Sequence, residues 1–111
     1  MSPEARLVLE RARARIDTPE KWAKGWYAFA ANGDRRWAGE AGAERFCCIG
    51  AIGREVDDVQ RYEEAMTAIR DAAPCENVAR WNDAPERTHA EVMAAFDKAL
   101  STPSRGATEG T

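Results

Sequence analysis

The first sixteen residues carry the clearest alternation of apolar and polar positions in the chain. Ser2-Pro3-Glu4 is typical of a helix start, because a hydroxyl can cap the first turn, proline is favoured at the first helical position and an acid suits the first turn. Apolar side chains then recur at helical spacing at Ala5, Val8, Leu9, Ala12 and Ile16. This periodicity predicts an amphipathic helix that ends near Ile16. A second, shorter helix is predicted after the cap Thr18, ending before Gly25.

The next segment, "GWYAFAANGDRRW", changes to the pattern of a β-hairpin. Aromatic residues alternate with alanines up to Asn32-Gly33, a dipeptide suited to a tight turn because both residues tolerate a positive φ. We expect strands over residues 26–31 and 34–37, packed against helices because a two-stranded hairpin is marginal alone. The glycine-rich "AGEAGA" that follows predicts a flexible connection.

Residues 44–56, "ERFCCIGAIGREV", are apolar around most of a helical circumference and predict the central, most buried helix. Gly50 and Gly53 would each cost this helix about 1 kcal/mol relative to alanine. Such a cost in a core helix is best explained by another element that packs very close to it.

Two more long helices follow. Asp57 and Gln60 have capping-box spacing, and the next inner stripe is Val59, Tyr62, Met66 and Ile69, with Pro74 as the stop. A short helical turn is predicted over residues 76–80. Thr88 and Glu91 form a second capping box, which opens a last helix with the stripe Val92, Met93, Phe96, Ala99 and Leu100.

These elements predict a mainly α (α+β) fold, with four to five helices around the central apolar helix and one small β-hairpin. The chain has 111 residues, of which 44% are hydrophobic, and this fits one domain with a modest core over residues 1–100. Residues 101–111 lack large apolar side chains and predict a disordered tail.

Net charge, and the lack of a membrane span or a secretory signal, limit the expected partners. No apolar run approaches the ~18 residues of a membrane span, and the N-terminus lacks the order of a secretory signal, so we expect a cytoplasmic protein without a membrane partner. The net charge is −3, which disfavours a dedicated nucleic-acid binder. Residues 1–36 nevertheless hold eight Lys and Arg against five Asp and Glu, a net charge of +3. Weak nucleic-acid binding through the arginines of the first helix therefore stays as one alternative.

The cysteines suggest an enzyme hypothesis that the sequence pattern disfavours. Cys47 or Cys48 could act as a nucleophile with His89 as its base, and Asp83 or Asn82 could orient the imidazole. The two cysteines lie in "RFCCIGAI", where burial would leave them inert, and His89 is expected to be exposed. A zinc site from Cys47, Cys48, Cys75 and His89 has poor spacing, since vicinal cysteines on a helix point about 100° apart. We expect no catalytic residues, no metal and no cofactor, with the two cysteines and His89 as weak candidates.

The segment "RWNDAPERTHAEV" at residues 80–92 offers the best candidate for a binding site. Asn82 and Asp83 can bond to backbone N–H groups and form turns, so the segment can be a structural joint between two helices. The alternative is a recognition pocket in which Asn82 and Asp83 are polar anchors and Trp81 or Trp37 provides a stacking surface.

Several motifs resemble those of a known family. They are W-x-x-G at Trp22 and Gly25, the turn at Asn32-Gly33, F-C-x-x-G-A over residues 46–51, and W-N-D-A-P-x-R-T-x-x-E-V over residues 81–92. Together they resemble a family of small bacterial and phage proteins that is described only as a domain of unknown function, over roughly residues 5–100. The resemblance implies a fold and no activity, and His89 is not part of its pattern.

The leading hypothesis is therefore a small, non-catalytic interaction or regulatory protein. It would bind a host protein, as a product of a phage or mobile element, through Trp37, Trp81, Asn82 and Asp83. A Cys-His thiol enzyme or a small-ligand-binding domain is the second hypothesis, and the oligomeric state stays open.

Overall fold

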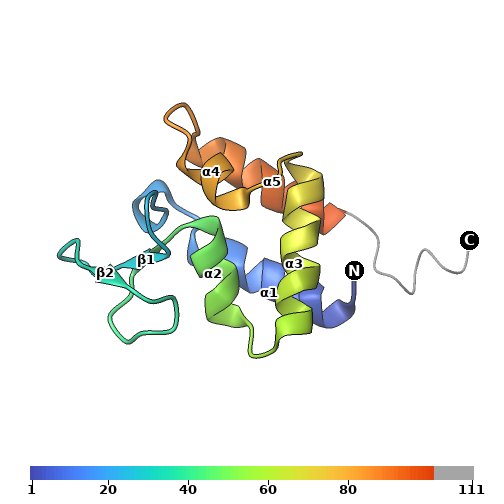
Figure 1. Ribbon diagram of the computed structural model, residues 1–111, viewed down its shortest axis with the longest axis horizontal. Coiled ribbons are helices and arrows are strands. Elements are labelled where there is room, and N and C mark those ends of the chain that lie inside the picture. Colours follow the sequence, from blue (N-terminus) through green and yellow to red (C-terminus); the bar gives the residue numbers. More distant parts are fainter. Residues whose placement is uncertain (102–111) are drawn as a thin grey trace, which may run out of the picture.

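The computed structural model describes residues 1–101, and the predicted tail from residue 102 onward lies outside this range. The described chain contains five α-helices and a small three-stranded antiparallel sheet, which confirms the predicted mainly α (α+β) fold (Figure 1). The helices are α1 (Pro3–Arg15), α2 (Cys48–Glu55), α3 (Val59–Ala72), α4 (Val78–Asp83) and α5 (His89–Ser101). A single 3-10 turn, η1 (Pro19–Lys21), replaces the predicted second helix.

Local capping signals set most helix starts. Ser2 caps α1 by accepting a hydrogen bond from the backbone N–H of Ala5, and Pro3 is the first helical residue. The start of α3 differs from the prediction by one residue, because Asp58 and not Asp57 accepts from the N–H of Arg61. Val59, predicted to lie on the inner stripe of this helix, is 76% exposed. As the first residue of α3, it lies ahead of the turns that carry the buried stripe.

The hairpin forms, and the structure adds a third strand to it. Strand β1 (Ala28–Phe29) lies between β2 (Arg35–Arg36) and β3 (Arg45–Phe46) and is antiparallel to both. In the turn, Gly33 has a φ of +92° and donates its N–H to the carbonyl of Ala30. The sheet lies at one end of the molecule, away from α3 and α5 (Figure 1).

The third strand corrects the predicted start of the central helix. Residues 45–46 pair with β1, and Cys47 then caps the helix by accepting from the N–H of Gly50 through its thiol. The prediction of a helix from residue 44 was wrong because apolar periodicity alone does not separate a buried strand from the helix that follows it. The helix α2 itself packs against α1, α3, α4 and β3, as its central position was predicted to require.

The core joins side chains from every helix. The largest fully buried side chains include Leu9 and Ile16 from the α1 region, Ile52 from α2, Ile69 from α3 and Phe96 from α5. Gly50 allows the closest approach in this core, because a Cβ atom there would lie 1.9 Å from the carbonyl oxygen of Tyr27. The prediction of a close neighbour is thus confirmed at Gly50. At Gly53 the nearest atom, the Cβ of Ala38, would lie 3.8 Å away, which is ordinary contact.

Candidate functional site

The Trp81-Asn82-Asp83 segment forms the last turn of α4 and was predicted to lie in the joint after it. The short helix begins later than expected, at Val78, because Asn77 caps it by accepting from the N–H of Arg80. The three side chains of the segment therefore point in different directions around a helix. They do not form one pocket wall, and each has its own surroundings.

Asn82 is fully buried and uses its whole amide in structural hydrogen bonds. Its Oδ1 accepts from the indole Nε1 of Trp22 (2.8 Å) and from the backbone N–H of Cys48 (3.1 Å). Its Nδ2 donates to the carbonyl of Ala23 (3.0 Å) and to Oδ1 of Asp83 (2.9 Å). Both lone-pair positions and both amide hydrogens are thus occupied. Asn82 ties the η1–β1 connection and the start of α2 to α4, and it has no polar group left for a ligand.

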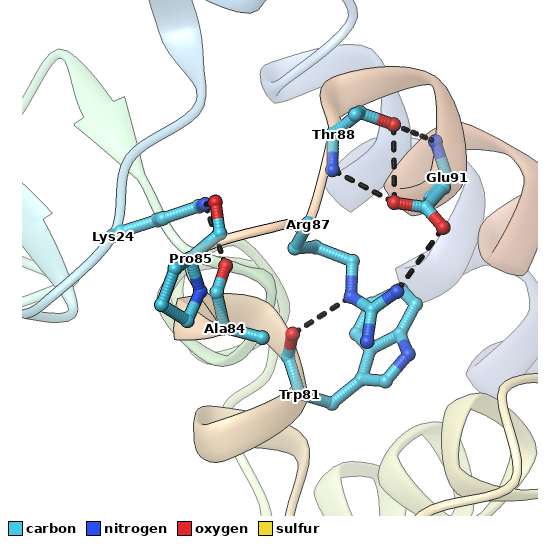
Figure 2. Close-up of polar contacts among 7 residues, drawn as sticks. All are labelled: Lys24, Trp81, Ala84, Pro85, Arg87, Thr88 and Glu91. Carbon is cyan, nitrogen blue, oxygen red and sulfur yellow. Dashed lines mark hydrogen bonds and ion pairs between the residues drawn. The ribbon is translucent and has the colours of Figure 1, made fainter.

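Trp81 lies in α4 and packs against the connection from α4 to α5 (Figure 2). The guanidinium carbon of Arg87 lies 4.4 Å from the centre of its ring, and Nε of Arg87 donates to the Trp81 carbonyl at 2.8 Å. Arg87 also pairs with Glu91 of α5, with 3.2 Å between Nη1 and Oε2. One face of the Trp81 ring is therefore covered by the protein's own arginine.

The predicted capping box opens α5 next to this joint. The N–H of Thr88 donates to Oε1 of Glu91, and the N–H of Glu91 donates to the hydroxyl of Thr88 (Figure 2). The bond from the Thr88 backbone is the main cause that holds the pKa of Glu91 below its usual value. On the other side of the joint, Nζ of Lys24 donates to the carbonyl of Ala84 at 2.7 Å.

Asp83 is the member of the segment that faces solvent. Its Oδ1 accepts from the N–H of Gly25 (3.0 Å) and from Nδ2 of Asn82, and these two neutral donors fix the orientation of the carboxylate. Among residues 1–101, no Lys, Arg or His side chain forms an ion pair with it. Asp83 therefore presents an oriented negative charge without a cationic partner in the described chain.

Three rings cluster next to the sheet, just before β1 and just after β2, and we call them the aromatic surface: Trp26, Tyr27 and Trp37. The ring centres of Trp26 lie 5.2 Å from Tyr27 and 5.3 Å from Trp37, and Tyr27 stacks on Trp37 at 6.2 Å. Trp37 is 60% exposed and Tyr27 is 39% exposed. The guanidinium of Arg35 lies 4.8 Å from the centre of the Trp26 ring. Large exposed rings gathered in this way are typical of contact surfaces.

A hollow of about 140 Å³ joins the aromatic surface to Asp83. Its lining comes from the segment before β1, the start of α2 and the end of α4: Gly25, Trp26, Tyr27, Cys47, Ile49, Ala79 and Asp83. Most of these side chains are apolar or aromatic, so the carboxylate of Asp83 is the charged group in the lining. We call this feature the Asp83 hollow.

The cysteines and the histidine have separate partners in the described chain. Cys47 and Cys48 are buried, and burial is the main cause that raises the pKa of both thiols. His89 was predicted to be exposed but is half-buried, because its Nε2 lies 2.7 Å from the carbonyl oxygen of Ile16 and its ring packs near Trp22. No hydrogen bond links His89 to a cysteine within residues 1–101.

Within the described residues, the cysteines, the histidine and the acids are not grouped for metal binding, and two arginines of α1 are paired. In the described part of the chain, no group of three or more His, Cys, Asp or Glu side chains is placed to hold a metal ion. No helix in this part is both long and apolar enough to cross a bilayer. On α1, Arg13 pairs with Asp97 at 2.6 Å and Arg15 with Glu55 at 2.8 Å. These two guanidinium groups are therefore occupied by the protein's own carboxylates.

The predicted binding residues thus separate into two groups. Trp37 and Asp83 lie on the aromatic surface and in the hollow, whereas Trp81 and Asn82 hold the helices together. The strand predicted over residues 26–31 is shorter in the structure, so Trp26 and Tyr27 precede β1. They were not among the predicted binding residues, although the concentration of aromatic residues at the hairpin was an available signal.

The comparisons with known proteins give a family and no activity. Comparisons with curated proteins and with solved structures gave no match. A model of DUF6197, a family of unknown function, matches residues 1–102, and this range includes every element described above. The chain therefore belongs to the family of unknown function DUF6197.

Proposed function

We propose that the protein is a non-catalytic interaction module that binds a partner protein through the aromatic surface of Trp26, Tyr27 and Trp37. The observation that carries this proposal is the exposure of a stacked ring cluster, with 60% of Trp37 in solvent. Tryptophan and tyrosine are enriched among the residues that dominate protein interfaces, because each buries a large rigid area.

The surroundings of the surface support binding and give little support to catalysis. Tyr27 directly precedes β1, Trp37 directly follows β2, and the backbone of Tyr27 packs against Gly50, so the surface is preorganised. The buried thiols have raised pKa values, which makes them poor nucleophiles near neutral pH. A cytoplasmic location, and a host target for a phage or mobile-element product, are part of the proposal and rest on the sequence alone.

The test compares two variants that each remove one exposed apolar side chain. Trp37→Ser removes the most exposed ring of the surface, and Val59→Ser removes a side chain that is 76% exposed at the start of α3. Tagged wild-type protein and both variants are used for affinity capture from a lysate of the source cells, with quantification of the captured proteins.

We expect a partner that wild type and Val59→Ser capture equally and that Trp37→Ser loses by at least about tenfold, the loss typical of an interface anchor. Circular dichroism must show that both variants keep the wild-type helix content. Equal capture by all three proteins would exclude the aromatic surface as the contact.

A further inference from the structure

The Asp83 hollow has the chemistry of a site for one cationic side chain. Its volume of about 140 Å³ is below the range of roughly 300–1,000 Å³ that is typical of pockets for drug-sized ligands. It therefore suits a single side chain or a group of that size. The lining includes Trp26 and Tyr27 together with Ile49 and Ala79.

The charge of the hollow selects the kind of side chain. Oδ1 of Asp83 is held by the N–H of Gly25 and by Asn82, and both are neutral donors. The carboxylate thus has a fixed direction, and in the described residues no cation pairs with it. The nearby Lys24 directs its Nζ to the carbonyls of Ala84 and Pro85. An oriented carboxylate in a hollow lined by two aromatic residues attracts a cation by charge pairing, and the rings can add cation–π attraction.

The aromatic walls favour a guanidinium over an ammonium group. A guanidinium is planar, stacks on rings and is less strongly hydrated, so it loses less on entering a half-open apolar hollow. The guanidinium of Arg35 lies 4.8 Å from the centre of the Trp26 ring, so a partner arginine would share this ring with the protein's own arginine.

The geometry points to an arginine side chain of the partner protein, seated in the Asp83 hollow between the aromatic rings and the carboxylate. This inference rests on the proposed function, because it names the chemistry of the partner that the aromatic surface contacts. It also makes Asp83 the residue that determines specificity, while the rings provide contact area.

The experiment is an NMR titration of the isotope-labelled full chain with Nα-acetyl-arginine methylamide. The matched probes are the lysine and glutamine derivatives of the same compound. The matched variants are Asp83→Asn, which keeps an Oδ1 acceptor for Gly25 and Asn82, and Glu63→Gln, which makes the same charge change at an exposed position on α3.

We expect the arginine probe to shift the amide signals of Gly25, Trp26, Tyr27 and Asp83 in a saturable manner. The lysine probe should bind more weakly, and the glutamine probe should leave these signals unchanged. Asp83→Asn should weaken arginine binding by at least about fivefold, while Glu63→Gln should bind as wild type does. Equal binding by wild type and Asp83→Asn, or equal shifts with the glutamine probe, would overturn the inference.

Two further results keep the test decisive. The first needs no variant. Binding of the arginine probe to wild type should weaken as the salt concentration is raised, because the attraction is between charges, and salt-independent binding would contradict the inference.

The second result separates the arginine inference from the proposed function. A partner that depends on Trp37, together with no arginine binding, keeps the proposed function and overturns this inference. Arginine binding without any partner that depends on Trp37 overturns the proposed function and supports the hollow as an arginine site.

Discussion

At the scale of single residues, Asn82 shows how one buried amide can hold three segments together. Replacing Asn82 by alanine leaves the Trp22 indole N–H, the Cys48 N–H and the Ala23 carbonyl without this partner. Each unsatisfied buried polar group costs about 1–3 kcal/mol, so we expect Asn82→Ala to lower the free energy of unfolding by about 3 kcal/mol or more. Urea unfolding measures this change.

Asn77→Ala is the matched control for that prediction. Asn77 is exposed and caps α4 through one bond to the N–H of Arg80, so its loss should cost about 1 kcal/mol. If both variants lose a similar amount of unfolding free energy, Asn82 has no special role in holding the segments together.

A second prediction at this scale concerns Glu91 and pH. Because the folded state holds the pKa of Glu91 below its usual value, its carboxylate stabilises the fold at pH values above that usual value. This contribution is lost as the pH falls through the lowered pKa of the folded state. We expect Glu91→Gln to melt below wild type near neutral pH, with a difference that shrinks in acid. Glu86→Gln, an exposed neighbour, should show no such pH-dependent difference, and parallel melting curves for wild type and Glu91→Gln at all pH values would contradict the prediction.

At the scale of elements, the two glycines of α2 form a natural pair for comparison. A methyl group at Gly50 would collide with the Tyr27 carbonyl, and this backbone atom cannot move without disturbing the sheet. We expect Gly50→Ala to destabilise the protein by about 3 kcal/mol or more, at the upper end of overpacking costs. A methyl group at Gly53 would make only an ordinary contact with the Cβ of Ala38, so Gly53→Ala should stabilise α2 by up to about 1 kcal/mol. Thermal and urea unfolding of both variants test whether Gly50→Ala lowers the free energy of unfolding and Gly53→Ala raises it.

The same elements show which parts of the fold can be read from sequence. The starts of α1 and α5 were predictable because their signals are local, in Ser2-Pro3 and in the Thr88–Glu91 capping box. Strand β3 was missed because it forms by pairing with β1, for example between Phe46 and Ala28, which lies eighteen residues earlier. No local signal in the sequence carries that pairing. The end of α4 was also missed, since the buried bonds of Asn82 come from distant segments.

The candidate site was predictable to a similar extent. Trp37 and Asp83 were selected from residue type alone, and both lie on the surface that the proposals use. Trp26 and Tyr27 joined them because the sheet and α4 meet at the start of α2. Their approach is set by tertiary packing through Gly50 and Asn82, and a linear pattern does not contain it.

At the scale of the whole molecule, the fold decides which reactive groups reach solvent. Cys47 and Cys48 are buried with raised pKa values, and Cys75 is half-buried. We expect iodoacetamide near neutral pH to modify Cys75 first, and Cys47 and Cys48 only after denaturation. His89→Ala should not change the rates in the folded protein. Fast modification of Cys47 that slows in His89→Ala would instead support the thiol-enzyme hypothesis. Mass spectrometry of the modified peptides identifies which cysteine reacts first.

The contact between Gly50 and the Tyr27 carbonyl has a consequence for the family as a whole. A relative with any side chain at the position of Gly50 must hold the segment before β1 farther from α2, whatever residue stands opposite, because the obstacle is a backbone atom. This shift should displace Tyr27, one of the residues that line the Asp83 hollow. The residue at this position should therefore separate family members that have the Asp83 hollow from members that lack it. Pairs of relatives that differ at this position should also differ in arginine binding.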